Sequence, residues 1–132
     1  MSTAPAARPL TSLSEEESLF RRTVRDFAER RLRPLVATMD RDARFAPGVI
    51  EELFPLGLMG IEVPPAYGGG GASFFAAVLA IEEVARVDPS VAVCIDVQNT
   101  MINKALMRWG DEAQRERYLP ALCRSTVGAY AL

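Results

Sequence analysis

Five polar side chains are set into a largely apolar helix between Val91 and Met107, and they are the first candidates for chemistry because apolar residues all round that helix predict that it is buried. They are Asp96, Gln98, Asn99, Thr100 and Asn103. A polar group that is buried without a partner costs roughly 1–3 kcal/mol, so these side chains need partners or a cavity. Asp96 and Thr100 are four residues apart, as are Asn99 and Asn103, so each pair could satisfy itself on one helix face. The spacing therefore fits two interpretations: the side chains pair with one another on the helix, or they face a cavity or another segment.

A second pattern places Gln98, Ile102 and Leu106 on one helical stripe. A polar tip above two aliphatic side chains is typical of one wall of a narrow apolar pocket that makes a polar contact along its length. The stripe therefore predicts a binding surface for a molecule with an aliphatic chain.

Other chemical candidates are weaker. Glu82 and Glu83 are adjacent, and neighbours on a helix point about 100° apart, so they cannot share one substrate proton. We expect one to face solvent and the other a partner. Gly68 to Gly71 are not followed by the Lys-Ser/Thr pair of a phosphate-binding loop, which favours a tight connection.

The composition excludes several classes of site. The chain has no histidine, which excludes histidine-based metal sites and Ser-His or Cys-His catalytic pairs within it, and we predict no metal site. Its two cysteines, Cys94 and Cys123, are far apart in apolar helical stretches, which favours packed thiols in a reduced compartment. A net charge of -2 argues against a nucleic-acid partner. No apolar run approaches the roughly 20 residues of a membrane span.

Helix signals predict an all-α domain of about five helices that positions these residues. We expect helices from about Glu15 to Asp40 with a kink at Pro34, from near Pro47 to Gly57, from Ser73 to Val87, from Asp88 to Trp109, and from Asp111 to about Cys123. The predicted N-terminal caps are Ser14, Ser73, Asp88 and Asp111. Gly110 is expected as a left-handed cap, and Pro120 should bend or shorten the last turn. Residues 1–13 are predicted to be a flexible tail, 14–126 the helical domain and 127–132 the opening of a strand.

Four ordered segments carry a family resemblance: Leu56–Pro64, Tyr67–Gly69, Ile81–Glu83 and Gln114–Pro120. Together they resemble the N-terminal domain of acyl-CoA dehydrogenases. Pro34–Asp40 and Ser90–Thr100 are most similar to the short/branched-chain subfamily. Pro55 and Gly71 depart locally from the family pattern.

The resemblance implies a larger enzyme with a helical N-terminal domain, a β-domain and a C-terminal helical domain, assembled as a homotetramer around FAD. Such an enzyme dehydrogenates acyl-CoA between its α and β carbons, in fatty acid and branched-chain amino acid degradation, and passes electrons to electron-transferring flavoprotein. Its catalytic base is a glutamate of the C-terminal domain, outside this chain, so the 132 residues alone are expected to be inactive. Tyr130, Ala131 and Leu132 match the flavin-contacting strand, which begins the β-domain. Gln98, Asn99, Ile102 and Leu106 match the acyl-pocket helix.

Two alternatives remain open at this point. The parent could belong to another acyl-CoA dehydrogenase or oxidase subfamily, or the chain could be a helical interaction module without catalysis. The resemblance implies a cytoplasmic protein if the source is bacterial and a mitochondrial matrix protein if it is eukaryotic.

Overall fold

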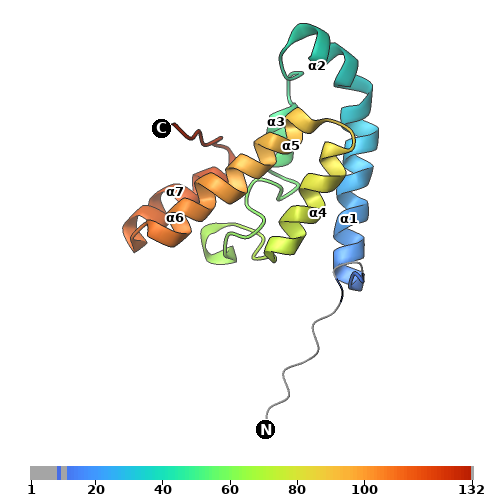
Figure 1. Cartoon of the computed structure of the whole chain (residues 1–132). Coiled ribbons are helices and arrows are strands. Elements are labelled where there is room, and N and C mark those ends of the chain that lie inside the picture. The colour runs from blue at the N-terminus through green and yellow to red at the C-terminus, as the bar shows by residue number, and fades with distance from the viewer. Residues whose placement is uncertain (1–8, 10–11, 132) are drawn as a thin grey trace.

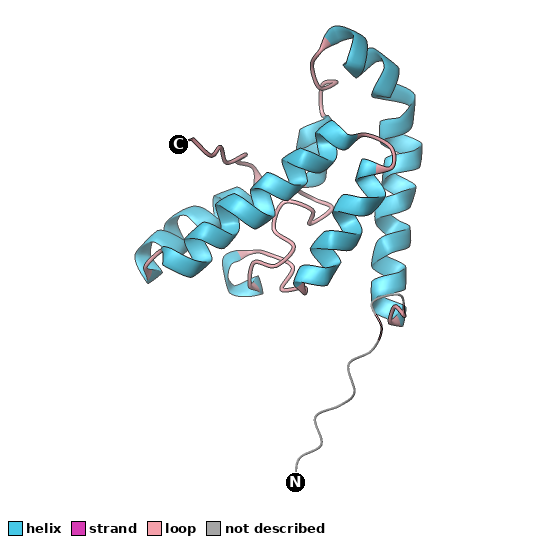
Figure 2. Ribbon diagram, viewed as in Figure 1, coloured by secondary structure: helices cyan, strands magenta, loops and turns pink. Residues whose placement is uncertain are grey.

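The computed structural model describes residue 9 and residues 12–131. Most of the predicted tail, and Leu132 of the predicted flavin contacts, lie outside the described residues. All regular structure in residues 12–131 is helical, which confirms the predicted all-α class with its five helices (Figures 1 and 2). No helix in this described part is long and apolar enough to span a membrane.

The first helix is one continuous rod of four segments: α1 (Glu15–Phe27), η1 (Ala28–Leu32, a π-helix), η2 (Arg33–Leu35, a 3-10 helix) and α2 (Val36–Asp42). Its start is set by a capping box, in which the Glu17 amide donates to Ser14 Oγ (3.1 Å) and the Ser14 amide to Glu17 Oε2 (2.6 Å). Pro34 lies in the 3-10 turn, where its missing N–H disturbs the α-helical bonding as predicted. The rod ends at Asp42, just beyond the predicted Asp40.

The second helix, α3 (Val49–Leu53), is followed by a long loop that contains η3 (Pro65–Tyr67, a 3-10 helix). It starts later than predicted because Gly48, at a φ of 85°, makes a turn between Pro47 and the helix. The glycine run is a tight connection, as expected. Three backbone bonds close the loop on itself: Gly70 N to Gly60 O, Gly71 N to Val63 O and Ala72 N to Ile61 O.

The third helix is α4 (Phe74–Ala85), and the fourth is a second composite rod of α5 (Pro89–Asp96), η4 (Val97–Asn103, a π-helix) and α6 (Lys104–Trp109). Ser73 caps α4, and Asp88 caps α5 by accepting from the Ser90 and Val91 amides, as predicted. In Figure 1, α4 lies between α1 and α5. The core forms where these three helices meet α3, around the fully buried Leu32, Leu53, Leu58, Met59, Val84 and Ile95.

The fifth helix, α7 (Glu112–Arg124), begins with a capping box between Asp111 and Gln114. The prediction that Gly110 is left-handed and the prediction that Pro120 could shorten α7 are wrong. Gly110 is extended (φ -71°, ψ 146°), not left-handed; a side chain there is disfavoured because a Cβ would lie 2.5 Å from the Leu106 carbonyl oxygen. Pro120 neither ends nor shortens the helix, which continues to Arg124. Pro120 lies within α7, and the helix continues although one backbone hydrogen-bond donor is missing there.

Residues 127–131 have no regular structure, although a strand was predicted from 127. A strand is defined by hydrogen bonds to a neighbouring strand, and no described segment lies beside this one as a partner. The strand therefore stays a prediction.

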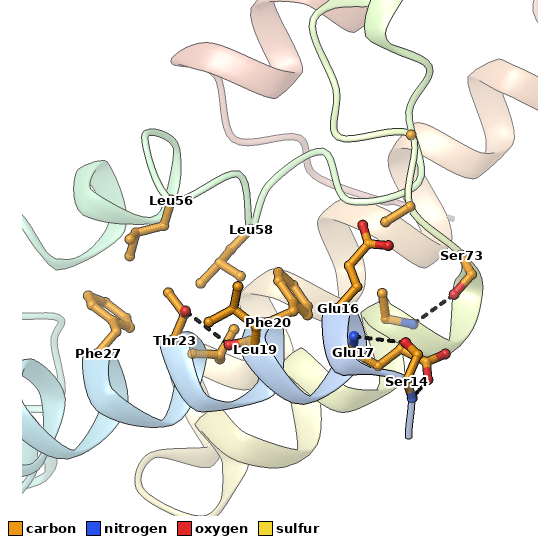
Figure 3. Close-up of a pocket in the computed structure, with 14 residues that line it drawn as sticks. Ser14, Glu16, Glu17, Leu19, Phe20, Thr23, Phe27, Leu56, Leu58 and Ser73 are labelled. Atoms are coloured by element: carbon orange, nitrogen blue, oxygen red, sulfur yellow. Dashed lines mark hydrogen bonds between the residues drawn. The ribbon is translucent and has the colours of Figure 1, made fainter. Parts of the chain in front are cut away.

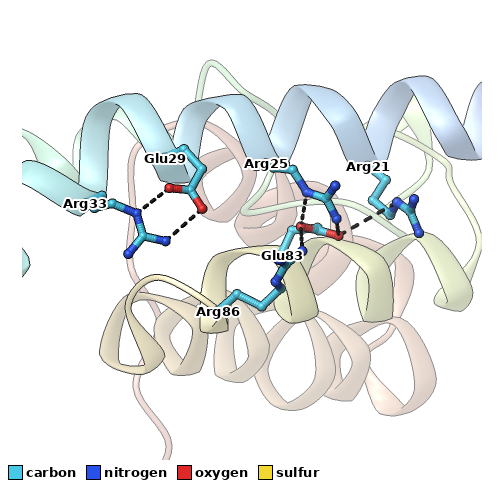
Figure 4. Close-up of polar contacts among 6 residues, drawn as sticks. All are labelled: Arg21, Arg25, Glu29, Arg33, Glu83 and Arg86. Carbon is cyan, nitrogen blue, oxygen red and sulfur yellow. Dashed lines mark hydrogen bonds and ion pairs between the residues drawn. The ribbon is translucent and has the colours of Figure 1, made fainter.

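An ion-pair cluster joins α1 to α4. Glu83 is only 3% exposed and accepts two bonds from Arg25, at 2.8 Å from Nε and 2.7 Å from the terminal nitrogen (Figure 4). Arg86 (3.2 Å) and Arg21 (3.8 Å) lie against the same carboxylate, while Glu29 pairs with Arg33 along the rod. Glu82, by contrast, is exposed. The expectation that one glutamate faces solvent and the other a partner is confirmed.

Candidate functional site

The helix Pro89–Trp109 separates two kinds of surface. Its inner face carries three buried amides, Gln98 (0% exposed), Asn99 (1%) and Asn103 (1%). Its outer face carries apolar side chains that the described residues leave uncovered, Val93 (57% exposed) and Met101 (39%). The helix was predicted to be buried all round, and its outer face corrects that prediction.

Two of the three amides hold the loop that follows α3. Asn99 Oδ1 accepts from the Ile61 amide (2.9 Å), and its Nδ2 donates to the carbonyls of Leu58 and Ile95 (2.8 Å each). Asn103 Nδ2 donates to the Met59 carbonyl (2.8 Å). The suggested Asn99–Asn103 pair is therefore replaced by bonds to the loop backbone. The Asp96–Thr100 pair does form, with Thr100 Oγ1 2.8 Å from the Asp96 carbonyl and 3.0 Å from Oδ1.

The third amide, Gln98, binds the C-terminal part of the chain. Its Nε2 donates to the carbonyls of Leu122 (2.8 Å) and Thr126 (3.0 Å), and its Oε1 accepts from the Gly128 amide (2.8 Å). All three partners lie 24 to 30 residues away in the sequence. A glutamine amide offers two N–H donors and one acceptor oxygen with two lone pairs. Gln98 uses both donors and one lone pair, so only the second lone pair of Oε1 is left.

The amides lie on the π-helical segment η4, Val97–Asn103. A π-helix inserts an additional residue per turn, so it rotates the side chains that follow relative to those that precede, and such segments occur frequently at functional sites. Within this segment Gln98, Asn99 and Asn103 are all buried, Asn99 and Asn103 against the loop after α3 and Gln98 against the C-terminal segment. Asn103 Oδ1 is a buried oxygen without a hydrogen-bond partner, the one such side-chain atom in the described part of the chain.

The other two residues of the predicted stripe are half-buried. Ile102 packs against Gly128 so closely that a Cβ on Gly128 would lie 2.5 Å from Ile102 Cγ2. Leu106 packs against the cluster of Val63, Leu119 and Cys123. Gln98, Ile102 and Leu106 thus share the side of the helix that faces α7 and the C-terminal segment, as one stripe. Substrate contact by these residues and by Asn99 remains a prediction.

A groove of about 520 Å³ runs between the outer face of this helix and the C-terminal segment. Its lining residues are Thr100, Met101, Lys104, Ala105, Met107, Arg108, Trp109 and Tyr130. Trp109 is 75% exposed and Tyr130 54%. Met101 and Trp109 were not among the predicted site residues. The signal that could have found them is the spacing of Val93, Val97 and Met101 at intervals of four, which places an apolar stripe opposite the amides.

A second groove, of about 540 Å³, lies along α1 (Figure 3). Its apolar lining residues include Leu19, Phe20, Phe27, Leu56 and Leu58, and its polar ones include Glu16, Glu17 and Thr23. The hydroxyls of Ser14 and Ser73 at one end are occupied in capping α1 and α4. The groove is therefore lined mainly by apolar side chains, and its two serine hydroxyls serve as helix caps.

The buried ionisable groups in the described part of the chain are paired or stand singly and do not come together as a catalytic set. Burial raises the pKa of both Cys94 and Cys123, which keeps the thiols protonated and unreactive. The hydrogen bonds from Arg25, and then its charge with those of Arg86 and Arg21, lower the pKa of Glu83, which remains a paired carboxylate. Within residues 12–131, no three His, Cys, Asp or Glu side chains gather as metal ligands. The described residues thus provide apolar surfaces and buried amides, and no set of groups for proton transfer is assembled among them.

Comparisons with known proteins identify this architecture. Residues 14–126 match the family model "Acyl-CoA dehydrogenase, N-terminal domain". The mitochondrial short/branched chain specific acyl-CoA dehydrogenase of Bos taurus is 46% identical over 131 residues, which cover 99% of this chain and 30% of the relative. Butyryl-CoA dehydrogenase from Megasphaera elsdenii has a TM-score of 0.79 at 30% identity, covering 85% of this chain and 30% of that chain.

A chain from the structure of the electron transferring flavoprotein of Acidaminococcus fermentans has a TM-score of 0.81 at 26% identity, over 85% of this chain and 30% of that chain. The chain spans about 30% of the length of the curated relatives it matches. On the strength of the match over residues 14–126, this chain belongs to the acyl-CoA dehydrogenase family, whose N-terminal domain it forms.

Proposed function

We propose that the chain is the N-terminal portion of an FAD-dependent dehydrogenase that acts on short or branched acyl-CoA thioesters. The observation that carries this proposal is the 46% identity to a short/branched chain specific enzyme over nearly the whole chain. The aliphatic side chains of Ile102 and Leu106 on one side of the helix Pro89–Trp109 support it, because an acyl chain needs an apolar wall.

Tyr130 and Ala131, with Leu132 beyond the described residues, are the proposed flavin contacts. Tyr130 and Ala131 are exposed, and no backbone group of residues 129–131 makes a hydrogen bond to another described residue. An exposed aromatic residue on a backbone with free donors and acceptors fits the edge of a flavin ring, which needs both kinds of partner. Bound FAD would supply the acceptor for the hydride that leaves the acyl β carbon. The chain's own residues would bind and orient the flavin and the acyl group.

The acyl wall is proposed to consist of Ile102 and Leu106, with the predicted contacts Gln98 and Asn99 behind it. Branched and bulky aliphatic side chains fill volume that a longer straight acyl chain would need. The two amides are fully occupied by backbone partners, so they act on a ligand through the geometry of the helix and of the segments they bind. Met101 lies on the exposed side of the helix and is not part of this wall.

Partners and location follow from the same proposal. Electron-transferring flavoprotein is the proposed electron acceptor and the homotetramer the proposed assembly. A mitochondrial enzyme in Bos taurus and an acyl-CoA dehydrogenase in Bacillus subtilis (34% identical, 91% of this chain) support a matrix location in a eukaryote and a cytoplasmic one in a bacterium.

Spectroscopy of the complete protein tests the proposal. Purified protein should carry flavin, and anaerobic 2-methylbutyryl-CoA should bleach its absorbance more efficiently than hexanoyl-CoA does. Electron-transferring flavoprotein should restore the oxidised spectrum. Fast reoxidation by oxygen with formation of hydrogen peroxide would indicate an oxidase instead. A colourless protein, or one bleached by no acyl-CoA, would overturn the proposal.

A further inference from the structure

We propose that Gln98 is a positioning residue that fixes the segment leading to Tyr130, and so sets where the flavin-contacting residues lie. The inference rests on the proposed function. It differs from the sequence-based prediction, which gave Gln98 a direct contact with substrate.

The first observation is what Gln98 binds. Its two donors bind the carbonyls of Leu122 and Thr126, at the end of α7 and just after it, and its oxygen binds the Gly128 amide. The last carbonyls of a helix have no partner within the helix, so Gln98 satisfies one of them from a different helix. One fully buried side chain thus joins the fourth helix, the end of α7 and the segment beyond it.

The second observation is that Gly128 and Ile102 touch one turn further along the same helix. The space between them is too small for a Cβ on Gly128. Gly128 does not have a positive φ, so glycine serves here to permit close approach and not to permit an unusual backbone. The segment is therefore fixed by a hydrogen bond on one side and by steric contact on the other.

The third observation is that these are the last hydrogen bonds before the proposed flavin contacts. Residues 129–131 bond to no other described residue. Consecutive Cα atoms are about 3.8 Å apart, so Tyr130 lies within about 8 Å of Gly128 and follows its displacement. Only a side chain with two donors and an acceptor at the same reach could replace Gln98. Glutamate lacks the donors and methionine lacks both.

The test compares Gln98→Met with a matched control, Asn99→Leu, in the complete flavoprotein. Both substitutions remove a buried amide with three bonds from adjacent positions of one helix, but Asn99 binds the loop at Leu58 and Ile61 instead of the C-terminal segment. We expect both variants to lower the melting temperature of the apoprotein by similar amounts. Gln98→Met should raise the Kd for FAD by about ten-fold, the effect of losing a net hydrogen bond or two, and should alter the flavin absorbance spectrum. Asn99→Leu should change the Kd by less than about two-fold, well under the energy of one hydrogen bond.

Equal effects of the two variants on FAD affinity would overturn the inference, as would an unchanged Kd in Gln98→Met. Wild-type protein without flavin would instead overturn the proposed function, so the two failures are distinguishable. A readout independent of flavin is amide hydrogen exchange at Gly128 in the 132-residue chain, which should accelerate in Gln98→Met and not in Asn99→Leu.

A second pair of variants keeps the test decisive if Gln98→Met does not fold. Gly128→Ala should displace the segment from Ile102 and weaken FAD binding, and adding Ile102→Ala should restore the space and recover at least half of the lost affinity on a logarithmic scale. Absence of recovery in the double variant would contradict the proposed geometry.

Discussion

Replacing Glu83 by glutamine removes the charge that joins α1 to α4 while preserving the shape of the side chain. The carboxylate is 3% exposed and accepts two short bonds from Arg25, with Arg86 at 3.2 Å. The amide that replaces it could still accept at one oxygen, so roughly one charge-assisted bond and the attraction to the arginines are lost. Removing such a bond costs about 1.5–3 kcal/mol. Arg25 is 40% exposed and stays hydrated, which favours the middle of that range, about 2 kcal/mol.

Thermal unfolding of the 132-residue chain provides the assay. For a domain of this size, about 2 kcal/mol corresponds to a fall in Tm of roughly 6–8 °C. Glu82→Gln is the matched control because Glu82 is the exposed neighbour on the same helix, and a surface change of this kind stays within about 0.5 kcal/mol. A Tm for Glu83→Gln that equals the Tm of Glu82→Gln at pH 7 would refute the estimate.

The pH dependence gives the same prediction a second measurement. The hydrogen bonds from Arg25 hold the pKa of Glu83 below its usual range, so the folded state favours the charged form more than the unfolded chain does. The stabilisation is complete above the unfolded pKa of about 4.3 and is lost as the pH falls through the lower folded pKa. The Tm difference between wild type and Glu83→Gln should therefore stay constant from pH 7 to about pH 5 and shrink below about pH 4.

Three further outcomes are expected. In the complete enzyme, Ile102→Ala should raise kcat/KM for hexanoyl-CoA relative to 2-methylbutyryl-CoA by about ten-fold, since each methylene in such a pocket is worth roughly 1–3 kcal/mol. If the ratio of the two kcat/KM values changes by less than about two-fold in a folded, flavin-loaded variant, the assignment of Ile102 to the acyl wall is wrong. The 132-residue chain by itself should be colourless. It should also self-associate through the exposed side chains of Met101 and Trp109, which light scattering would detect. A clean monomer at high concentration would count against the predicted self-association. Gly69→Ala should destabilise the chain strongly in chemical denaturation, because a Cβ would lie 2.1 Å from the Val63 carbonyl oxygen, whereas Gly57→Ala meets no atom within 4 Å and should cost only the strain of its positive φ.

The helix starts could be predicted from sequence because their determinants are local. Ser14, Ser73, Asp88 and Asp111 each satisfy amides within the next three residues, and all four act as predicted. The prediction of a left-handed cap at Gly110 was wrong because glycine is needed there for a steric reason: a side chain would collide with the carbonyl of Leu106.

The candidate site was less predictable for a physical reason. The partners of Gln98 lie at least 24 residues away, so spacing along the helix could show that the amide needs a partner but not which one. The π-helical turn over Val97–Asn103 also shifts side chains relative to ideal helical spacing. The stripe of Gln98, Ile102 and Leu106 was nevertheless recognised from its spacing, whereas the stripe of Val93, Val97 and Met101 was present in the sequence but was not proposed as a site.

The glycine loop has a consequence for how the chain tolerates changes in length. Surface loops usually accept insertions and deletions because few contacts depend on their register. Here the Gly70, Gly71 and Ala72 amides bind carbonyls of the bend from Gly60 to Val63, and Asn99 of the fourth helix binds the Ile61 amide and the Leu58 carbonyl. One added residue would shift every one of these pairings at once. Among natural and engineered variants, the segment from Gly60 to Ala72 should therefore keep a constant number of residues, and length variation should concentrate instead in the turn between α2 and α3.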